Sequence, residues 1–380
     1  MQSGQITARH YVTAKPVTVQ WENGIIQSVT PAAHAPENLW VAPALVDLQI
    51  NGFAGVDFQR DELTEADLLR ASRALAAAGC TRFLLTLVTD AWPNLMARLR
   101  HLSDLRGSSA ELQRAIAGWH VEGPFLSPEP GYCGAHNAAV MCDPKPQHME
   151  ELRASVGDAP VLLTIAPERP GAMEAIARAT ALGFKVSLGH TNASGETLAK
   201  AVQAGAVGFT HLGNGCPNDL NRFDNILWRV FDTKGLTVSL IPDRIHVSPS
   251  LFRLTHKVLG NDAMYYTTDA MSAAGAPPGR YSLGALELEV GEDRVVRYPG
   301  KPNFAGSALR PIDGILLAAR TLGCDWREVW DRFSGNPARL MNLPSGLQRG
   351  MPADFCLLEV AESNQLQSMK VISRGQWQLS

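Results

Sequence analysis

Four short apolar stretches of the chain each end in a residue whose side chain can do chemistry. These residues are His190 after Val-Ser-Leu-Gly, His211 after Gly-Phe-Thr, Glu122 after His-Val, and Asp269 after Tyr-Tyr-Thr-Thr. Two imidazoles and a carboxylate are the ligand set of an open catalytic metal site. A further carboxylate is the base that a metal-activated water needs. The sequence therefore predicts a catalytic metal site with its own general base.

Single polar residues that recur at the C-terminal ends of successive strands are typical of a parallel β/α barrel. The middle of the chain alternates apolar runs with segments of helical period, and we expect helices over 63–78, 172–182 and 194–204, with Thr64 as an N-cap. The expected strands are 40–46, 82–87, 118–121, 160–165, 185–188, 208–209, 237–241 and 264–267. No glycine-rich dinucleotide fingerprint follows the first strand, so an α/β fold of the (β/α)₈ barrel type is favoured over a doubly wound sheet.

Both ends of the chain have a β pattern instead. Residues 17–19 and 25–29 flank an Asn-Gly turn at 23–24, and residues 353–359 and 369–373 precede a turn at 374–376. We therefore expect a small β domain formed by residues 1–42 and 343–380, beside a barrel over 43–342.

The composition excludes several classes of protein. The chain has 380 residues, 45% hydrophobic and 19% charged, with a formal net charge of −3 and no Lys/Arg-rich run that would indicate nucleic-acid binding. No apolar stretch has the length of a membrane span, and the first residues lack a signal-peptide pattern, so we expect a cytoplasmic protein. The six cysteines show no CxxC spacing and are expected to be free thiols.

A wider set of motifs resembles the amidohydrolase superfamily and, within it, the N-acetylglucosamine-6-phosphate deacetylases. The matching segments, spread over nearly the whole chain, are 42–47, 51–52, 120–124, 135–137, 189–191, 210–212, 243–246, 268–270, 305–307 and 336–338. The resemblance implies a metal-dependent barrel with a β-sandwich of terminal strands, usually in a homodimer. It also implies hydrolysis of the acetamide of an N-acetyl amino-sugar 6-phosphate to acetate and a free amine.

The same resemblance implies roles for individual residues. Glu122, His190 and His211 would hold one divalent metal, expected to be zinc, although iron, manganese or cobalt fit the same ligands. Asp269 would act as general base and then as general acid toward the leaving nitrogen, and it also fits an N-cap position. His136 would hydrogen-bond the substrate and polarise the scissile carbonyl.

The substrate contacts implied by the resemblance lie in several loops. Arg222 and His246 are the expected phosphate clamps, and the resemblance implies that one or both of them can be contributed to the site of a partner subunit. An alternative for Arg222 is a solvated surface arginine, and Trp228 is interpreted as a core or interface residue. The remaining expected contacts are Ala135, Asn214, Gly215, Asp243, Arg244, Ile245, Phe304, Ala305 and Gly306.

The chain also departs from the superfamily pattern. Gln49 and Asn51 occupy the positions of a His-x-His pair that binds a second metal in many amidohydrolases, which favours one metal here. Asp57, just downstream, is a candidate to support a second cation. Two further departures, a run of small residues at 213–216 and an arginine at position 244, leave the identity of the sugar undetermined. The galactosamine epimer and a non-phosphorylated acetamido or cyclic-amide substrate therefore remain alternatives. The alternative that is not an enzyme is a non-catalytic protein that senses an amino-sugar phosphate.

Overall fold

Eight parallel strands form the centre of the computed structural model, which describes residues 3–299, 304–361 and 365–378. Neighbouring strands follow one another around the sheet in the order of the sequence, and an isolated parallel bridge between Ile50 and Ala270 links its two ends. The predicted (β/α)₈ barrel is therefore confirmed. Its strands are β5 (Leu45–Ile50), β8 (Cys80–Val88), β9 (Ile116–Glu122), β10 (Val161–Ile165), β11 (Lys185–Leu188), β12 (Ala206–Phe209), β13 (Thr237–Leu240) and β14 (Met264–Tyr266).

A buried carboxylate joins the first and last barrel strands. Asp47 lies on β5, and its oxygens accept hydrogen bonds from the hydroxyls of Thr267 and Thr268 just after β14. Complete burial raises the pKa of Asp47 to about 6, although the hydrogen bonds oppose that rise. This contact fixes the end of β14 against β5, next to the position from which Asp269 projects.

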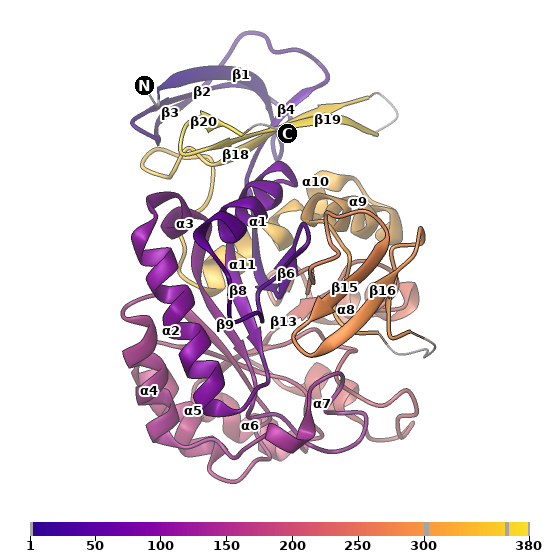
Figure 1. Cartoon of the computed structure of the whole chain (residues 1–380). Coiled ribbons are helices and arrows are strands. Elements are labelled where there is room, and N and C mark those ends of the chain that lie inside the picture. Colours follow the sequence, from indigo (N-terminus) through magenta and orange to yellow (C-terminus); the bar gives the residue numbers. More distant parts are fainter. Residues whose placement is uncertain (1–2, 300–303, 362–364, 379–380) are drawn as a thin grey trace.

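Helices cover the outside of the barrel (Figure 1). The expected helix at 63–78 is α1, which begins after Thr64 with a capping box formed with Asp67. The expected helix at 194–204 is α6, which is capped by Ser194 and ends at Gly205 in the left-handed conformation. The helices are α1 (Glu65–Ala77), α2 (Trp92–Ser108), α3 (Ala110–Ala115), α4 (Pro146–Val156), α5 (Ala172–Ala181), α6 (Gly195–Ala204), α7 (Ile226–Asp232), α8 (Pro249–Leu259), α9 (Pro311–Leu322), α10 (Trp326–Trp330) and α11 (Gly335–Leu340).

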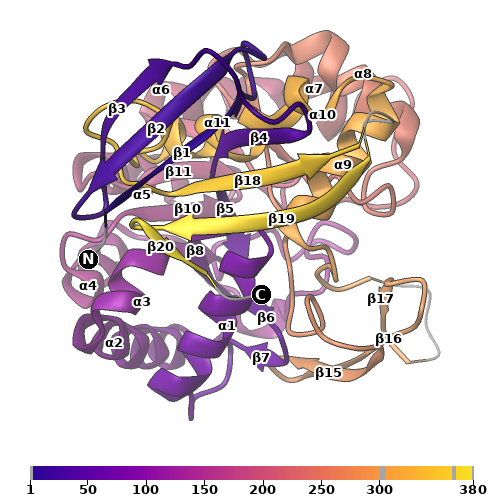
Figure 2. The same cartoon turned by 90° about the horizontal axis from the view of Figure 1, so that it is seen from above.

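Strands from both ends of the chain pair in one seven-stranded sheet, which forms the β-sandwich-like domain and lies over one end of the barrel (Figure 2). The strands are β1 (Gly4–His10), β2 (Pro16–Glu22), β3 (Ile25–Pro31), β4 (Leu39–Pro43), β18 (Phe355–Val360), β19 (Leu366–Ser373) and β20 (Gln376–Trp377). Both expected turns are present, at Asn23-Gly24 and Arg374-Gly375, and all four residues have positive φ. The outermost residues of the expected domain, 1–2 and 379–380, lie outside the described residues.

One expected strand is wrong. The apolar run 40–46 is divided at Ala44, because β4 pairs with β1 and β18 in the terminal sheet whereas β5 pairs with β8 in the barrel. The apolar character of the run continues through both strands because both are buried, so hydrophobicity alone does not mark the boundary.

A small sheet that the sequence analysis did not predict stands at the side of the barrel (Figure 1). It consists of β15 (Gly279–Leu283), β16 (Leu286–Val290) and β17 (Val296–Arg297), and a short hairpin of β6 (Gly52–Phe53) and β7 (Val56–Asp57) lies nearby. Asp57 connects the two, because its carboxylate accepts hydrogen bonds from Ser282 Oγ and from the Gly284 backbone nitrogen. Among the described residues, no helix combines the length and the apolar character needed to cross a membrane.

Candidate metal and catalytic site

A cavity of about 1150 Å³ opens at the C-terminal ends of the barrel strands. It brings together most of the residues predicted from the sequence. Those that line it are Glu122, Ala135, His136, His190, His211, Asn214, Gly215, Ile245, His246, Asp269, Phe304, Ala305 and Gly306. Three predicted contacts, Arg222, Asp243 and Arg244, are absent from the lining formed by the described residues.

Three of the predicted side chains converge at one point in the cavity. Oε1 of Glu122 lies 2.8 Å from Nε2 of His211 and 3.5 Å from Nε2 of His190, and the two Nε2 atoms are 3.2 Å apart. Burial opposes the charge of Glu122, but its interactions with the two imidazoles outweigh that effect and hold its pKa below the usual range. The carboxylate of Glu122 is thus ionised, and it faces two imidazole nitrogens.

The loop before the η1 turn (Ala138–Val140) orients His190. Nδ1 of His190 donates a hydrogen bond to the backbone oxygen of Tyr132 at 2.8 Å, which leaves the lone pair on Nε2. Gly134 and Gly215 both lie against the His190 ring. A Cβ atom added at Gly134 would lie 2.9 Å from Cε1 of His190, and one added at Gly215 would lie 2.7 Å from Nδ1. Both glycines also have positive φ. A side chain at either position would therefore clash with the ring and also strain the backbone.

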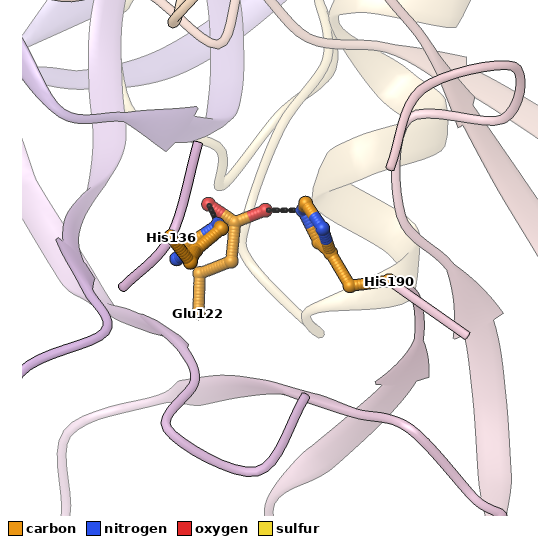
Figure 3. A group of neighbouring side chains, drawn as sticks. All are labelled: Glu122, His136 and His190. Atoms are coloured by element: carbon orange, nitrogen blue, oxygen red, sulfur yellow. Dashed lines mark ion pairs between the residues drawn. The ribbon is translucent and has the colours of Figure 1, made fainter. Parts of the chain in front are cut away.

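His136 lies on the other side of Glu122 from His190 (Figure 3). Its Nδ1 accepts a hydrogen bond from the backbone nitrogen of Thr89 at 3.4 Å, and burial with the neighbouring imidazoles lowers its pKa to about 3. His136 is therefore neutral at pH 7 with its proton on Nε2, which lies 4.0 Å from Oε2 of Glu122. That N–H is a donor directed into the cavity.

Three functional residues share an unusual backbone conformation. The φ angles are +50° at His190, +32° at His211 and +51° at Asp269, each two or three residues after the end of a barrel strand. Non-glycine residues rarely adopt this region, and such strain persists only where the surrounding structure imposes it. In each case the turn directs the side chain of the residue into the cavity.

Asp269 lines the same cavity as Glu122 and the two imidazoles. Burial and the negative charge of Glu122 raise its pKa above the usual value for a carboxyl group. Oδ1 of Asp269 accepts hydrogen bonds from Nε2 of Gln49 at 3.0 Å and from Nδ2 of Asn51 at 2.7 Å. The alternative role of Asp269 as an N-cap does not apply, because no helix of the described residues begins directly after it.

The opposite wall of the cavity contains His246. Its Nδ1 lies 2.6 Å from Oδ2 of Asp243, and burial alone would lower its pKa, but this hydrogen bond and the charge of Asp243 raise it. Oδ1 of Asp243 also accepts the backbone N–H groups of Ile245 and His246. The carboxylate of Asp243 thus holds this loop in place, and the ring of His246 faces the cavity next to Phe304.

The two other predicted contacts lie on the surface. Arg244 is exposed and has a φ of +66°. Arg222 is exposed, and its guanidinium lies over the ring of Phe223, 4.5 Å from the centroid. Within a single chain, neither residue lines the cavity.

Sequence reasoning missed the roles of Gln49 and Asn51, and the hairpin that closes one wall. Asp47 and Gln49 lie on β5 and Asn51 directly follows it, so the three residues alternate with a period of two, which was a usable signal. Residues 283–286, between β15 and β16, also line the cavity. Asp57, a candidate for a second cation, does not line it, and its oxygens are occupied by three hydrogen bonds.

The residues at the centre of the cavity fit a divalent metal. Two imidazole nitrogens and a carboxylate oxygen lie within 3.5 Å of one another, and His190 has the outer hydrogen bond that fixes a metal-binding tautomer. Glu122, His136 and His190 also offer atoms that all lie within 4.8 Å of one another. Because Nε2 of His136 carries its proton, His136 adjoins the three predicted ligands as a hydrogen-bond donor rather than as a fourth ligand.

Comparison with known proteins gave consistent results, although no family model matches the chain. The N-acetylglucosamine-6-phosphate deacetylase of Bos taurus is 32% identical over 332 residues, covering 84% of this chain and 79% of that protein. The Homo sapiens protein of the same name is 30% identical over 350 residues, covering 89% and 83%. A mutant N-acetyl-D-glucosamine-6-phosphate deacetylase from Mycobacterium smegmatis, solved with N-acetyl-D-glucosamine-6-phosphate, superimposes with a TM-score of 0.88 at 29% identity and covers all of both chains.

Proposed function

Because the chain belongs to the N-acetylglucosamine-6-phosphate deacetylase family, we propose that its strand-end cavity is a mononuclear deacetylase site in which Glu122, His190 and His211 hold the metal. The reaction is hydrolysis of N-acetylglucosamine 6-phosphate to acetate and the amino sugar phosphate. The observation that carries the site assignment is the convergence of Glu122 Oε1 with both imidazole Nε2 atoms, beside the carboxylate of Asp269.

Zinc is the metal we expect for this donor set, because two imidazoles and one carboxylate with an open position are typical of catalytic zinc. Bound there, a divalent metal supplies a Lewis acid that activates water and polarises the amide carbonyl. Gln49 occupies a position where a second metal would need a ligand, and a carboxamide is a weak ligand for zinc. One metal per chain follows from this donor set.

Asp269 transfers the proton. It takes a proton from the attacking water as the new C–O bond forms, and it delivers that proton to the nitrogen as the C–N bond breaks. Without the proton the nitrogen would leave as an unstable amide anion. The raised pKa of Asp269 suits both steps, because the carboxylate can take up the proton of the water and the resulting acid can then donate it to the nitrogen.

His136 supplies a hydrogen-bond donor to the substrate oxygen. It is neutral, and Thr89 fixes its tautomer, so its Nε2–H is available without a competing charge. A fixed donor of this kind stabilises the negative charge that develops on the amide oxygen.

His246 binds the phosphate, and Arg222 acts in the site of a second copy of the chain. The pKa of His246 is raised by Asp243, so the ring is a suitable partner for a phosphate dianion. Arg222 does not line the cavity of its own chain, but it lies beside two exposed aromatic side chains that a second copy would cover. These side chains are Phe223, which is 80% exposed, and Trp228.

The substrate is tested by following acetate release from zinc-loaded enzyme with N-acetylglucosamine 6-phosphate, its galactosamine epimer and unphosphorylated N-acetylglucosamine. A strong preference for N-acetylglucosamine 6-phosphate supports the proposal. Equal rates on both phosphorylated sugars would move the assignment to a broader amino-sugar phosphate deacetylase. No release from any of them, with zinc bound and the fold intact, would contradict it.

A further inference from the structure

Two carboxamide side chains from the end of β5 converge on one oxygen of Asp269. Gln49 Nε2 lies 3.0 Å and Asn51 Nδ2 lies 2.7 Å from Oδ1, and both residues are 2% exposed. The two bonds end on the same oxygen, so Oδ2 is left for the reacting groups. An oxygen that accepts two fixed donors holds the carboxylate plane in one orientation.

The same nitrogen of Gln49 also reaches the metal-ligand cluster. Its second hydrogen points to Oε1 of Glu122 at 2.9 Å. The NH₂ end of the carboxamide is required there, because the carbonyl end would face two carboxylates that can only accept. One NH₂ group therefore bridges the carboxylate that binds the metal and the carboxylate that transfers the proton.

The bridge also addresses an electrostatic problem. Glu122 and Asp269 are two buried carboxylates in one cavity, and like charges in a buried site repel. A donor shared between them offsets part of this repulsion and fixes their separation, as a second cation would do between them. Gln49 contacts both carboxylates, whereas Asn51 contacts only Asp269.

We propose that Gln49 and Asn51 are positioning residues: Asn51 orients the proton-transferring carboxylate, and Gln49 couples that carboxylate to the metal ligand Glu122. The inference rests on the proposed function for the identity of the reaction, but the contacts themselves do not depend on the substrate. It predicts different consequences for the two residues, and a merely structural role would not produce that difference.

The test compares Gln49→Met and Asn51→Leu, near-isosteric changes that remove the donors. Both variants should lower kcat for acetate release by about 10- to 100-fold with KM little changed, since the transfer step alone loses its alignment. Zinc affinity, measured by chelator competition without substrate, should fall about tenfold in Gln49→Met. In Asn51→Leu it should stay within about twofold of wild type, because that side chain does not touch Glu122.

The matched control is Asn336→Leu. Asn336 is also buried, and its Nδ2 donates to the backbone oxygens of Asn261 and Met264, away from the cavity. This variant should lose stability with kcat and zinc affinity within about twofold of wild type. If Asn51→Leu fails to fold, Asn51→Ser replaces it, since serine leaves more room and cannot span the distance to Asp269.

Several outcomes decide the question. Wild-type kcat in both variants would overturn the proposal, and so would equal losses of zinc affinity in both. If kcat and zinc affinity in Gln49→Met and Asn51→Leu equal those of Asn336→Leu, both residues have only a structural role. That result would also overturn the proposal. If the wild-type chain releases no acetate from N-acetylglucosamine 6-phosphate, the proposed function fails, whereas the difference in zinc affinity between the variants still tests the bridge.

Discussion

The backbone oxygen of Tyr132 accepts a hydrogen bond from Nδ1 of His190 at 2.8 Å, and this bond determines which nitrogen of the ring faces the cavity. The loop that carries Tyr132 can make this contact because Gly134 and Gly215 leave room around the imidazole. The orientation of the His190 ring, and with it the proposed metal binding, therefore depends on two glycines that have no side chain.

Gly215→Ala should weaken zinc binding. A Cβ atom at this position would lie 2.7 Å from Nδ1 of His190, and the φ of +60° is strained for alanine. Displacing the ring should cost about tenfold or more in zinc affinity, as loss of an outer contact to a metal ligand commonly does. Gly195→Ala is the control, because a Cβ there meets nothing within 4 Å. Equal zinc affinity in the two variants would show that the ring tolerates the added methyl group.

Asp269→Asn should abolish turnover without removing the metal. The amide keeps the shape of the side chain but cannot take a proton, so kcat should fall by about 10²- to 10⁴-fold or more. Zinc content, measured by metal analysis of the dialysed protein, should remain equal to that of wild type, because Asp269 is not among the proposed ligands. Retained turnover would refute the role of Asp269 as the proton-transfer group.

The KM for the phosphorylated substrate should rise with pH. Burial tends to lower the pKa of His246, but Asp243 raises it above the usual value, so the ring is cationic below that pKa and loses its charge as the pH passes through it. The attraction to phosphate is therefore present on the acidic side and lost on the alkaline side. Unphosphorylated N-acetylglucosamine should show no such rise in KM.

His246→Gln should raise KM for the phosphorylated sugar about 10- to 100-fold near neutral pH and flatten its pH dependence, because a charge-assisted hydrogen bond is lost. The comparison is made with KM values from acetate release at a series of pH values. A parallel increase for the unphosphorylated sugar would indicate that His246 supports the cavity rather than the phosphate.

Mixing two inactive variants should restore activity if Arg222 acts across a dimer. Arg222→Ala lacks the clamp and Asp269→Asn lacks the proton-transfer group, so a mixed dimer has one site with both residues. Random exchange of subunits should return about a quarter of the sites to function. Acetate release from the mixture after exchange, compared with the sum of the separate variants, measures this. An additive result would contradict action across the dimer.

Much of the fold follows from local sequence signals. The expected helices agree with α1, α5 and α6 to within a few residues, because Thr64 and Ser194 supply caps and the apolar period of each segment matches its buried face. The residues at the strand ends follow from topology, since parallel strands of a barrel deliver their C-terminal residues to one face. His190, His211 and Asp269 therefore meet although they are far apart in the sequence.

The missed features depend on contacts between distant segments. Asp354 receives two hydrogen bonds from the guanidinium of Arg82, a buried ion pair that joins the terminal sheet to the barrel across 272 positions of the sequence. Gln49 similarly meets its partners 73 and 220 residues away. Local periodicity cannot reveal such pairs. Arg222 illustrates the opposite case, because the resemblance implies a phosphate contact for it but the residue does not line the cavity of its own chain.

Titration of metal-free enzyme with zinc, followed by acetate release from N-acetylglucosamine 6-phosphate, tests the central claim most directly. One donor set of Glu122, His190 and His211 predicts that activity rises linearly and reaches its maximum at one zinc per chain. Activity that requires a second equivalent would contradict the mononuclear site. No acetate release at any zinc content would contradict the proposed reaction itself.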